Sequence, residues 1–177
     1  LKSYIFVPAR APEPKITQLL IFGATVLRVQ GTYEQAFDLC GEACRKYGWY
    51  NRSSGINPFL VEGKKTAGLE IAEQMGNNIP DWVVVSVGDG CTIGGIGKGL
   101  QEMKHLGLLE RVPRLLGVQA EGARPITDAF ISGQPLVPCS TNTLADSIAV
   151  GTPRNWRRAL KQVRDSNGEM IAVSDEE

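Results

Sequence analysis

The chain has 177 residues, of which 42% are hydrophobic and 21% charged, the ordinary composition of a folded globular protein. Its 19 basic side chains equal its 19 acidic side chains, so the charge does not indicate a nucleic acid or a lipid surface as a partner. The sequence contains no apolar run of about eighteen residues and no signal peptide. We therefore expect a cytoplasmic protein without a membrane span.

Strands and helices are predicted to alternate in the first part of the chain. Runs of β-branched and aromatic residues predict strands, and apolar residues at helical spacing closed by glycine predict helices. Thr32 and Gln35 have the spacing of a capping box, which marks the start of a helix. The predicted order is strand 3–8, helix 15–22, strand 24–29, helix 32–47 and a third strand at 49–51. This alternation is typical of a parallel α/β unit.

The second part of the chain continues the same alternation. A polar stretch at 53–66 is predicted to be a loop of the kind that carries function, and the basic helix at 154–164 is predicted to present a solvated face. The remaining predicted elements are helix 66–75, strand 83–87, a helix from 93, strand 115–120, a turn at 121–125, a crossing segment at 132–143, a short helix within 143–151 and strand 170–173. We predict an α/β fold with an open, mostly parallel sheet and helices on both faces.

The stretch from Asp81 to Gly99 is the most informative part of the sequence. The valine-rich run at 83–87 does not alternate, which is typical of an inner strand buried on both faces of a parallel sheet. Gly88, Asp89, Gly90, Cys91 and Thr92 follow it directly, and a helix comes next. A turn between strand and helix offers free backbone N–H groups and the positive end of a helix dipole to an anion. We expect the anion to be a phosphate.

Two common phosphate-binding patterns are excluded by specific residues. The dinucleotide fingerprint requires glycine at its sixth place, where Ile93 stands, and the Walker loop requires glycine where Thr92 stands and a hydroxyl where Gly99 stands. What remains is a five-residue cup with glycine at places one and three and a hydroxyl at place five. A glycine-rich turn without a ligand remains the alternative.

The cysteines predict neither a disulfide framework nor a metal site. Cys40 and Cys44 share one face of a predicted helix, but there is no second ligand pair nearby and His105 is the only histidine. We interpret these two as buried thiols. Cys91 differs because it lies at a helix start, where a thiolate is favoured, although its amide alone would serve the cup.

Both ends of the sequence suggest an internal fragment. Leu1 replaces an initiator methionine and is followed at once by a strand, and Ser174 to Glu177 has the form of a capping box for a helix that does not follow. A natural short protein with an acidic tail is the alternative.

Four stretches together resemble the threonine synthase family. The cup resembles the phosphate loop of fold-type II pyridoxal-phosphate enzymes, the relatives of the tryptophan synthase β subunit. The other matching stretches are Asn57-Pro58-Phe59 with Glu62 to Thr66, Leu116 to Ala120 with Gly122-Ala123, and Thr143-Leu144-Ala145 with Ile148 and Gly151-Thr152-Pro153. The resemblance covers essentially the whole chain.

The resemblance implies a pyridoxal 5'-phosphate lyase that eliminates phosphate from O-phosphohomoserine and adds water at the β-carbon to give threonine. It implies that Gly88, Asp89, Gly90, Cys91 and Thr92 hold the cofactor phosphate, and that Ser54 and Asn57 contact a small amino-acid substrate. It further implies that residues 1–56 belong to a small mobile domain and residues 57–177 to the large cofactor-binding domain of a homodimeric enzyme. No metal is implied.

Three departures from the family qualify this interpretation. The Schiff-base lysine of the family lies upstream of this segment, and Lys64, Lys65 and Lys98 match no such role, so no catalytic residue is assigned and the segment alone is expected to be inactive. The family has an arginine where Leu60 stands and an Asn-Ser pair where Ser54 and Gly55 stand, and these family residues help to hold the substrate phosphate. An uncharged residue is usual in place of Asp89, whose carboxylate would repel a phosphate unless it points away from it, toward a lysine.

Two other functions remain open at this stage. The stretch Thr143 to Val150 also resembles a segment of serine/threonine dehydratases. A non-catalytic domain that keeps a phosphate cup is the alternative outside enzymes.

Overall fold

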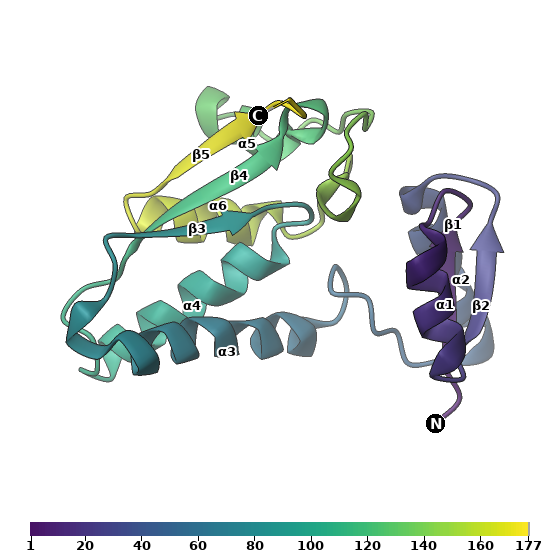
Figure 1. Cartoon of the computed structure of the whole chain (residues 1–177), viewed down its shortest axis with the longest axis horizontal. Coiled ribbons are helices and arrows are strands. Elements are labelled where there is room, and N and C mark those ends of the chain that lie inside the picture. The colour runs from purple at the N-terminus through teal and green to yellow at the C-terminus, as the bar shows by residue number, and fades with distance from the viewer. Residues whose placement is uncertain (177) are drawn as a thin grey trace. The chain divides into compact units, whose positions relative to one another are not determined.

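The structure is a computed structural model that describes residues 1–176, except for the side chain of Asn77. The chain divides into two compact units, Leu1–Ser53 and Ser54–Glu177 (Figure 1). The division falls three residues before the predicted boundary at residue 56. Each unit alternates strands with helices around a parallel sheet, so the predicted α/β class is confirmed.

The first unit contains two parallel strands and two helices. Its elements are β1 (Tyr4–Pro8), α1 (Glu13–Ile21), β2 (Thr25–Val29) and α2 (Tyr33–Tyr47), and the register runs from Tyr4 opposite Thr25 to Pro8 opposite Val29. The predicted capping box is confirmed, because Thr32 accepts a hydrogen bond from the Gln35 N–H and Gln35 accepts one from the Thr32 N–H.

The predicted third strand at 49–51 is wrong, since these residues form neither helix nor strand. The Trp49 ring instead stacks on Tyr4, with ring centroids 4.3 Å apart, and on Tyr47. Gly48 ends α2 in the left-handed conformation at φ 67°. The aromatic run therefore folds back on the unit through its side chains and adds no strand to the sheet.

The described residues of the second unit, 54–176, form a three-stranded parallel sheet of order β3-β4-β5 and four α-helices. Val83 lies opposite Leu115, and Gly117 lies opposite Met170. The elements are α3 (Pro58–Met75), β3 (Trp82–Ser86), α4 (Cys91–His105), β4 (Arg114–Ala120), α5 (Pro125–Ser132), α6 (Trp156–Asp165) and β5 (Glu169–Val173), with short 3-10 turns at Gly76–Asn78, Glu121–Ala123 and Asp146–Ile148.

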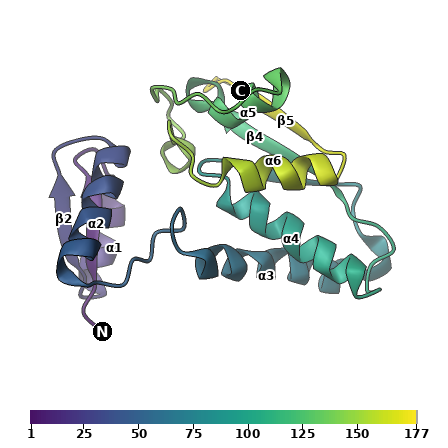
Figure 2. The same cartoon turned by 180° about the vertical axis from the view of Figure 1, so that it is seen from behind.

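Helices α4, α5 and α6 cover one face of this sheet (Figures 1 and 2). The main core lies beneath them and includes Val85, Ile93, Leu115 and Ile126. Val84 points to the opposite face and is 63% exposed. Strand β3 lies at the edge of the described sheet, whose order is β3-β4-β5. The prediction that it is an inner strand buried on both faces is therefore wrong for the described residues.

Helix α3 begins at Pro58, eight residues before the predicted start at Thr66. Asn57 caps it by accepting a hydrogen bond from the Phe59 N–H at 3.1 Å, and proline is favoured at the first helical position. The first half of this helix was not predicted, because glycine residues in its contact with α4 leave little apolar periodicity in the sequence. A Cβ atom on Gly68 would collide with the Ile96 carbonyl oxygen, and one on Gly95 would lie 2.7 Å from Lys64 Cβ.

Two other differences concern the end of the chain. Helix α5 was not predicted, because Pro125 was interpreted as the end of a turn and no element was predicted for 126–131. Pro125 starts the helix, and Ile126 and Ala129 are buried. The predicted basic helix and last strand are confirmed as α6 and β5. The predicted capping box pairs Ser174 with Glu177, which lies outside the described residues. Among the described helices, none has the length and apolarity needed to cross a bilayer.

Candidate functional site

The predicted cup lies where β3 turns into α4. Strand β3 ends at Ser86 and α4 begins at Cys91, so Gly88, Asp89 and Gly90 form the turn. Cys91 and Thr92 are already the first two residues of the helix, two residues earlier than predicted. The order of strand, glycine-rich turn and helix is confirmed.

The turn presents backbone N–H groups that have no partner within the described residues. The first N–H of α4 with an intramolecular acceptor is that of Gly94, which bonds the Gly90 carbonyl at 3.1 Å, whereas the N–H groups of 88–93 have none. Gly90 has φ 90°, a backbone conformation that residues with a side chain rarely adopt. A Cβ atom at this position would lie only 3.0 Å from Ala159 Cβ. The result is a helix start with uncompensated donors, which stabilises an anion.

Asp89 turns its carboxylate toward the start of α6. One carboxylate oxygen accepts a hydrogen bond from the Arg154 backbone N–H at 2.7 Å, and the other accepts one from Asn155 Nδ2 at 2.7 Å. The Asp89 carbonyl also accepts a hydrogen bond from the Asn155 N–H at 3.1 Å. The predicted lysine partner is wrong, because the carboxylate bonds a helix start. Asp89 therefore ties the turn to α6.

Lys64 brings a positive charge to the cup that the sequence interpretation missed. Its ammonium group donates a hydrogen bond to the Thr92 hydroxyl at 3.4 Å. Lys64 reaches Thr92 because glycines let α3 and α4 approach closely. The nearby Cys91 is buried, and its sulfur lies 3.6 Å from the Ser54 hydroxyl. The sequence did contain a signal for this charge, namely the lysine pair Lys64-Lys65 after Gly63. The sequence analysis matched this pair to the family but gave it no role.

Gln119 is a buried amide that supports the strand before the turn. It is fully buried on β4, donates a hydrogen bond to the Val87 carbonyl at 3.3 Å and accepts one from the Thr127 N–H at 2.9 Å. The Thr127 hydroxyl donates to the same Gln119 oxygen at 3.2 Å. The signal in the sequence was a glutamine within the otherwise apolar run 115–120, and the sequence analysis gave it no role.

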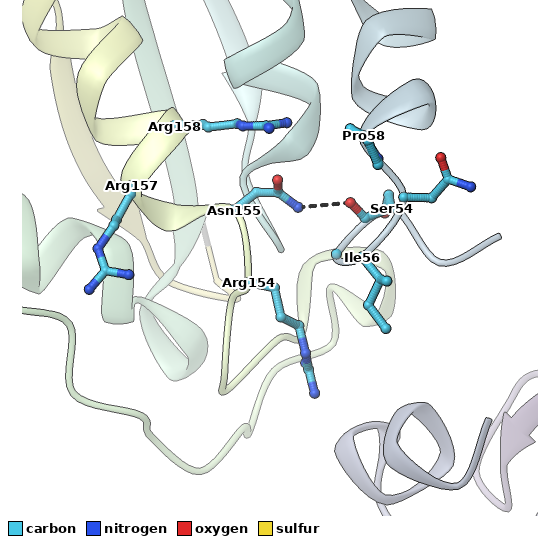
Figure 3. A pocket seen from close by; sticks show the side chains of 9 residues that line it. Ser54, Ile56, Pro58, Arg154, Asn155, Arg157 and Arg158 are labelled. Atoms are coloured by element: carbon cyan, nitrogen blue, oxygen red, sulfur yellow. Dashed lines mark hydrogen bonds between the residues drawn. The ribbon is translucent and has the colours of Figure 1, made fainter. Parts of the chain in front are cut away.

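Ser54 and Asn57, the predicted substrate contacts, lie beside the turn. The Ser54 carbonyl accepts a hydrogen bond from Asn155 Nδ2 at 3.2 Å, so Asn155 bridges Ser54 and Asp89. Asn57 is buried and its side-chain oxygen caps α3. Both residues line a cavity of about 240 Å³ (Figure 3), together with Gly55, Ile56, Pro58, Arg154, Asn155, Arg157 and Arg158. The five cup residues do not line this cavity.

The residues of the turn fit a phosphate group. Unbonded N–H groups, the Thr92 hydroxyl and the Lys64 ammonium group supply donors, and the one carboxylate of the turn is directed elsewhere. Gly88 leaves little room for a side chain, because a Cβ atom there would lie 3.1 Å from Ile148 Cα. The described residues contain no group of three His, Cys, Asp or Glu side chains that could hold a metal ion.

Comparison with known proteins identifies the family. The family described as "Pyridoxal-phosphate dependent enzyme" matches residues 1–177. The chain belongs to this family. The cofactor in this family's description carries a phosphate group, which is the kind of anion that the free N–H groups of the turn can bind.

Individual relatives narrow the similarity further. The chain is 40% identical over 165 residues to threonine synthase of Methanosarcina acetivorans, covering 92% of this chain and 40% of the relative. It is 35% identical over 178 residues to threonine synthase of Synechocystis sp., covering 100% of this chain and 44% of the relative. The chain thus spans less than half the length of these relatives.

Solved structures show the same fold. Serine racemase of maize matches with a TM-score of 0.79 and 21% identity over 99% of this chain and 50% of its own. Threonine deaminase isoform 2 of Solanum lycopersicum matches with a TM-score of 0.76 and 24% identity over 97% of this chain and 48% of its own. The predicted fold-type II architecture is consistent with both.

Proposed function

We propose that this chain is part of a threonine synthase, a pyridoxal-phosphate lyase that converts O-phosphohomoserine and water into threonine and phosphate. The observation that carries the proposal is the segment 88–92, whose backbone N–H groups are free at the N-terminus of helix α4. The similarity to curated threonine synthases at 40% and 35% identity supports this choice over other reactions of the family.

The cup residues take the cofactor phosphate in this proposal. Main-chain N–H groups of Gly88, Asp89, Gly90 and Cys91 donate to the phosphate oxygens, and the Thr92 hydroxyl adds a side-chain donor. Lys64 compensates part of the negative charge, because its ammonium group lies at the Thr92 hydroxyl. Bound pyridoxal phosphate supplies an electron sink for the carbanion of the amino-acid substrate. The residues of this chain fix its position and orientation.

We assign no catalytic residue to this chain. Lys65 is paired with Glu62 and Glu102, and Lys98 with the same two carboxylates. Both lysines thus form ion pairs between α3 and α4, and we propose neither as the Schiff-base amine. We therefore expect residues 1–177 alone to be inactive and catalysis to require the full-length protein.

The remaining assignments extend the same proposal. Ser54 and Asn57 contact the amino-acid substrate, and Asn57 also caps α3. Residues 1–56 belong to a small mobile domain and residues 57–177 to the large cofactor-binding domain, close to the observed division after Ser53. The full-length enzyme acts as a cytoplasmic homodimer on a small amino acid.

The test is substrate profiling of the full-length protein loaded with pyridoxal phosphate. We expect O-phosphohomoserine to yield threonine and inorganic phosphate in equal amounts. Release of ammonia and an oxo acid from serine or threonine, without threonine formation from O-phosphohomoserine, would replace this proposal by the dehydratase alternative. Absence of a cofactor absorbance band after addition of pyridoxal phosphate would instead favour a non-catalytic domain.

A conservative variant links the turn to cofactor binding. Thr92→Val keeps the size of the side chain and removes its hydroxyl, so we expect the dissociation constant for pyridoxal phosphate to rise by about tenfold. Thr66→Val is the matched control, since the Thr66 hydroxyl donates to the Gly63 carbonyl within α3 and has no other partner in the described part of the chain. Equal cofactor affinity in both variants would contradict the assignment of Thr92.

A further inference from the structure

The stretch from Thr143 to Val150 has no role in the function proposed above. It belongs to the segment between α5 and α6, which runs along the edge of the sheet where β3, β4 and β5 end (Figure 1). Ligands of open α/β sheets bind at this edge. We call residues 142–148 the strap, because they contact the chain just beyond the end of each of the three strands.

Backbone contacts place the two ends of the strap. The Asn142 N–H donates a hydrogen bond to the Gly122 carbonyl at 3.0 Å, just beyond the end of β4. Gly122 allows this approach, because a Cβ atom there would collide with the Asn142 carbonyl oxygen. At the other end of the strap, Ile148 Cα lies where a Cβ atom on Gly88 would be only 3.1 Å away. The strap therefore lies directly against the first residue of the cup.

Asp175, just beyond the end of β5, holds the first half of the strap. One carboxylate oxygen accepts a hydrogen bond from the Thr143 hydroxyl at 2.5 Å, and the other accepts one from the Leu144 N–H at 3.0 Å. A distance of 2.5 Å is typical of a hydroxyl group bonded to a charged carboxylate. The Thr143 oxygen also accepts a hydrogen bond from the Ala145 N–H at 3.1 Å, which forms a local turn. One carboxylate thus orders three consecutive residues.

Burial of apolar side chains contributes little to the position of the strap. Leu144 is 85% exposed, and Asn142, Asp146 and Ser147 are exposed as well. Hydrophobic stabilisation is proportional to the apolar area that is removed from water, which is small for these residues. The position of the strap therefore depends on its polar contacts, and Asp175 supplies two of them.

We propose that Asp175 is a positioning residue for the cofactor phosphate. Its carboxylate holds the strap against Gly88, and the strap fixes the direction of the Gly88 N–H, one of the donors assigned to the phosphate. Asp175 acts through the strap and is assigned no contact with the cofactor. This proposal rests on the proposed function, because it takes the cup to be the cofactor site. The alternative is a carboxylate that stabilises the folded chain without influence on the cup.

Absorbance titration of the cofactor-free full-length protein with two ligands tests the proposal. The ligands are pyridoxal phosphate and pyridoxal, which lacks the phosphate group. Asp175→Ala should raise the dissociation constant for pyridoxal phosphate by about fivefold, as expected for a residue that acts through a packed segment. It should leave the dissociation constant for pyridoxal unchanged. A carboxylate with only a stabilising role would change neither constant, or would change both by the same factor.

Variants of Thr143 test the same contact from its other side. Thr143→Val removes the hydroxyl group and should weaken pyridoxal phosphate as Asp175→Ala does, whereas Thr143→Ser keeps the hydroxyl group and should bind like the unmodified protein. Adding Thr143→Val to Asp175→Ala should cause little further loss, because both changes break one contact. Asp128→Asn is the matched control, since this exposed carboxylate pairs with Arg124 within α5. We expect it to change the affinity by less than about twofold.

Limited proteolysis measures the position of the strap without the cofactor. Thermolysin cleaves before leucine, and Leu144 is exposed. Asp175→Ala should speed cleavage at Leu144 by about fivefold, because the released strap opens more often. Coupling between two sites is reciprocal, so saturating inorganic phosphate should slow this cleavage in the unmodified protein and slow it less in Asp175→Ala.

Failure of this proposal and failure of the proposed function give different results. If O-phosphohomoserine yields threonine but Asp175→Ala binds both ligands as tightly as the unmodified protein, this proposal is wrong and the proposed function stands. An equal loss of affinity for pyridoxal would also overturn it. If the protein binds no pyridoxal phosphate, the proposed function fails, and cleavage at Leu144 that does not respond to inorganic phosphate would overturn this proposal too. Thermal unfolding verifies that each variant is folded, and the Thr143 variants give the same test if Asp175→Ala is not.

Discussion

Replacing Asp89 by alanine removes both side-chain hydrogen bonds that join the turn to α6. These bonds come from the Arg154 N–H and from Asn155 Nδ2, each at 2.7 Å. A hydrogen bond to a charged group contributes about 1.5–3 kcal/mol. The main-chain bond from Asn155 to the Asp89 carbonyl remains, and water can reach the half-buried turn. We therefore expect a loss at the lower end of the sum, about 3 kcal/mol.

A loss of about 3 kcal/mol changes the folding equilibrium by roughly 140-fold. In a protein of this size or larger it lowers the unfolding temperature by roughly 6–12 °C. Urea unfolding of the full-length protein, followed by tryptophan fluorescence, measures the difference. Asp89→Asn keeps an acceptor for the Arg154 N–H but turns a donor toward the Asn155 amide, so we expect about half the effect.

The affinity for pyridoxal phosphate decides what Asp89 does. If the carboxylate orients the turn through α6, both variants lose stability and bind the cofactor more weakly. If the carboxylate instead faced the phosphate, its removal would relieve repulsion and the variants would bind the cofactor more tightly at unchanged stability. That second result would refute the role of Asp89 as a tie to α6.

Three further predictions concern the contact between α3 and α4. Gly99→Ala forces a methyl group into the main chain of α3 and should cost about 1–3 kcal/mol in urea unfolding, whereas Gly63→Ala, which has open space around it, should be neutral or stabilising. Lys64→Met should weaken pyridoxal phosphate binding about tenfold in an absorbance titration, because it removes the charge at the Thr92 hydroxyl; unchanged affinity would place that charge outside the site. The pKa of Glu62 is lowered, chiefly by a hydrogen bond from Lys98. Its stabilising contribution is therefore present above the unfolded-state pKa of about 4.3 and is lost as the pH falls through the lower folded-state pKa. Glu62→Gln should remove that part of the acid dependence of urea unfolding, and an identical acid profile would contradict it.

Local patterns in the sequence were sufficient for much of the fold. The capping box at Thr32, the valine run before the turn and the glycine-rich start of α4 each depend on residues close in sequence, and the structure confirms them. Helix α3 was missed in part because glycine forms its contact face, which leaves little apolar periodicity. The aromatic residue Trp49 was assigned to a strand because its stacking on Tyr4 depends on tertiary structure.

The candidate site shows the same division. The residues of the turn could be predicted because the donors belong to one short segment. The direction of the Asp89 carboxylate could not, because its partners Arg154 and Asn155 lie 65 and 66 residues further along the chain. The position of Lys64 at Thr92 likewise depends on the crossing of two helices.

The buried side chain of Gln119 links the turn to the backbone N–H of Thr127. It bonds the Val87 carbonyl on one side and the Thr127 N–H on the other, so a change in the turn that shifts Val87 alters the acceptor of the Thr127 proton. Occupancy of the turn by an anion should slow exchange of that proton with deuterated solvent. The amide of Thr127, eight residues beyond Gln119 in the chain, thus offers a spectroscopic view of a ligand that it does not touch.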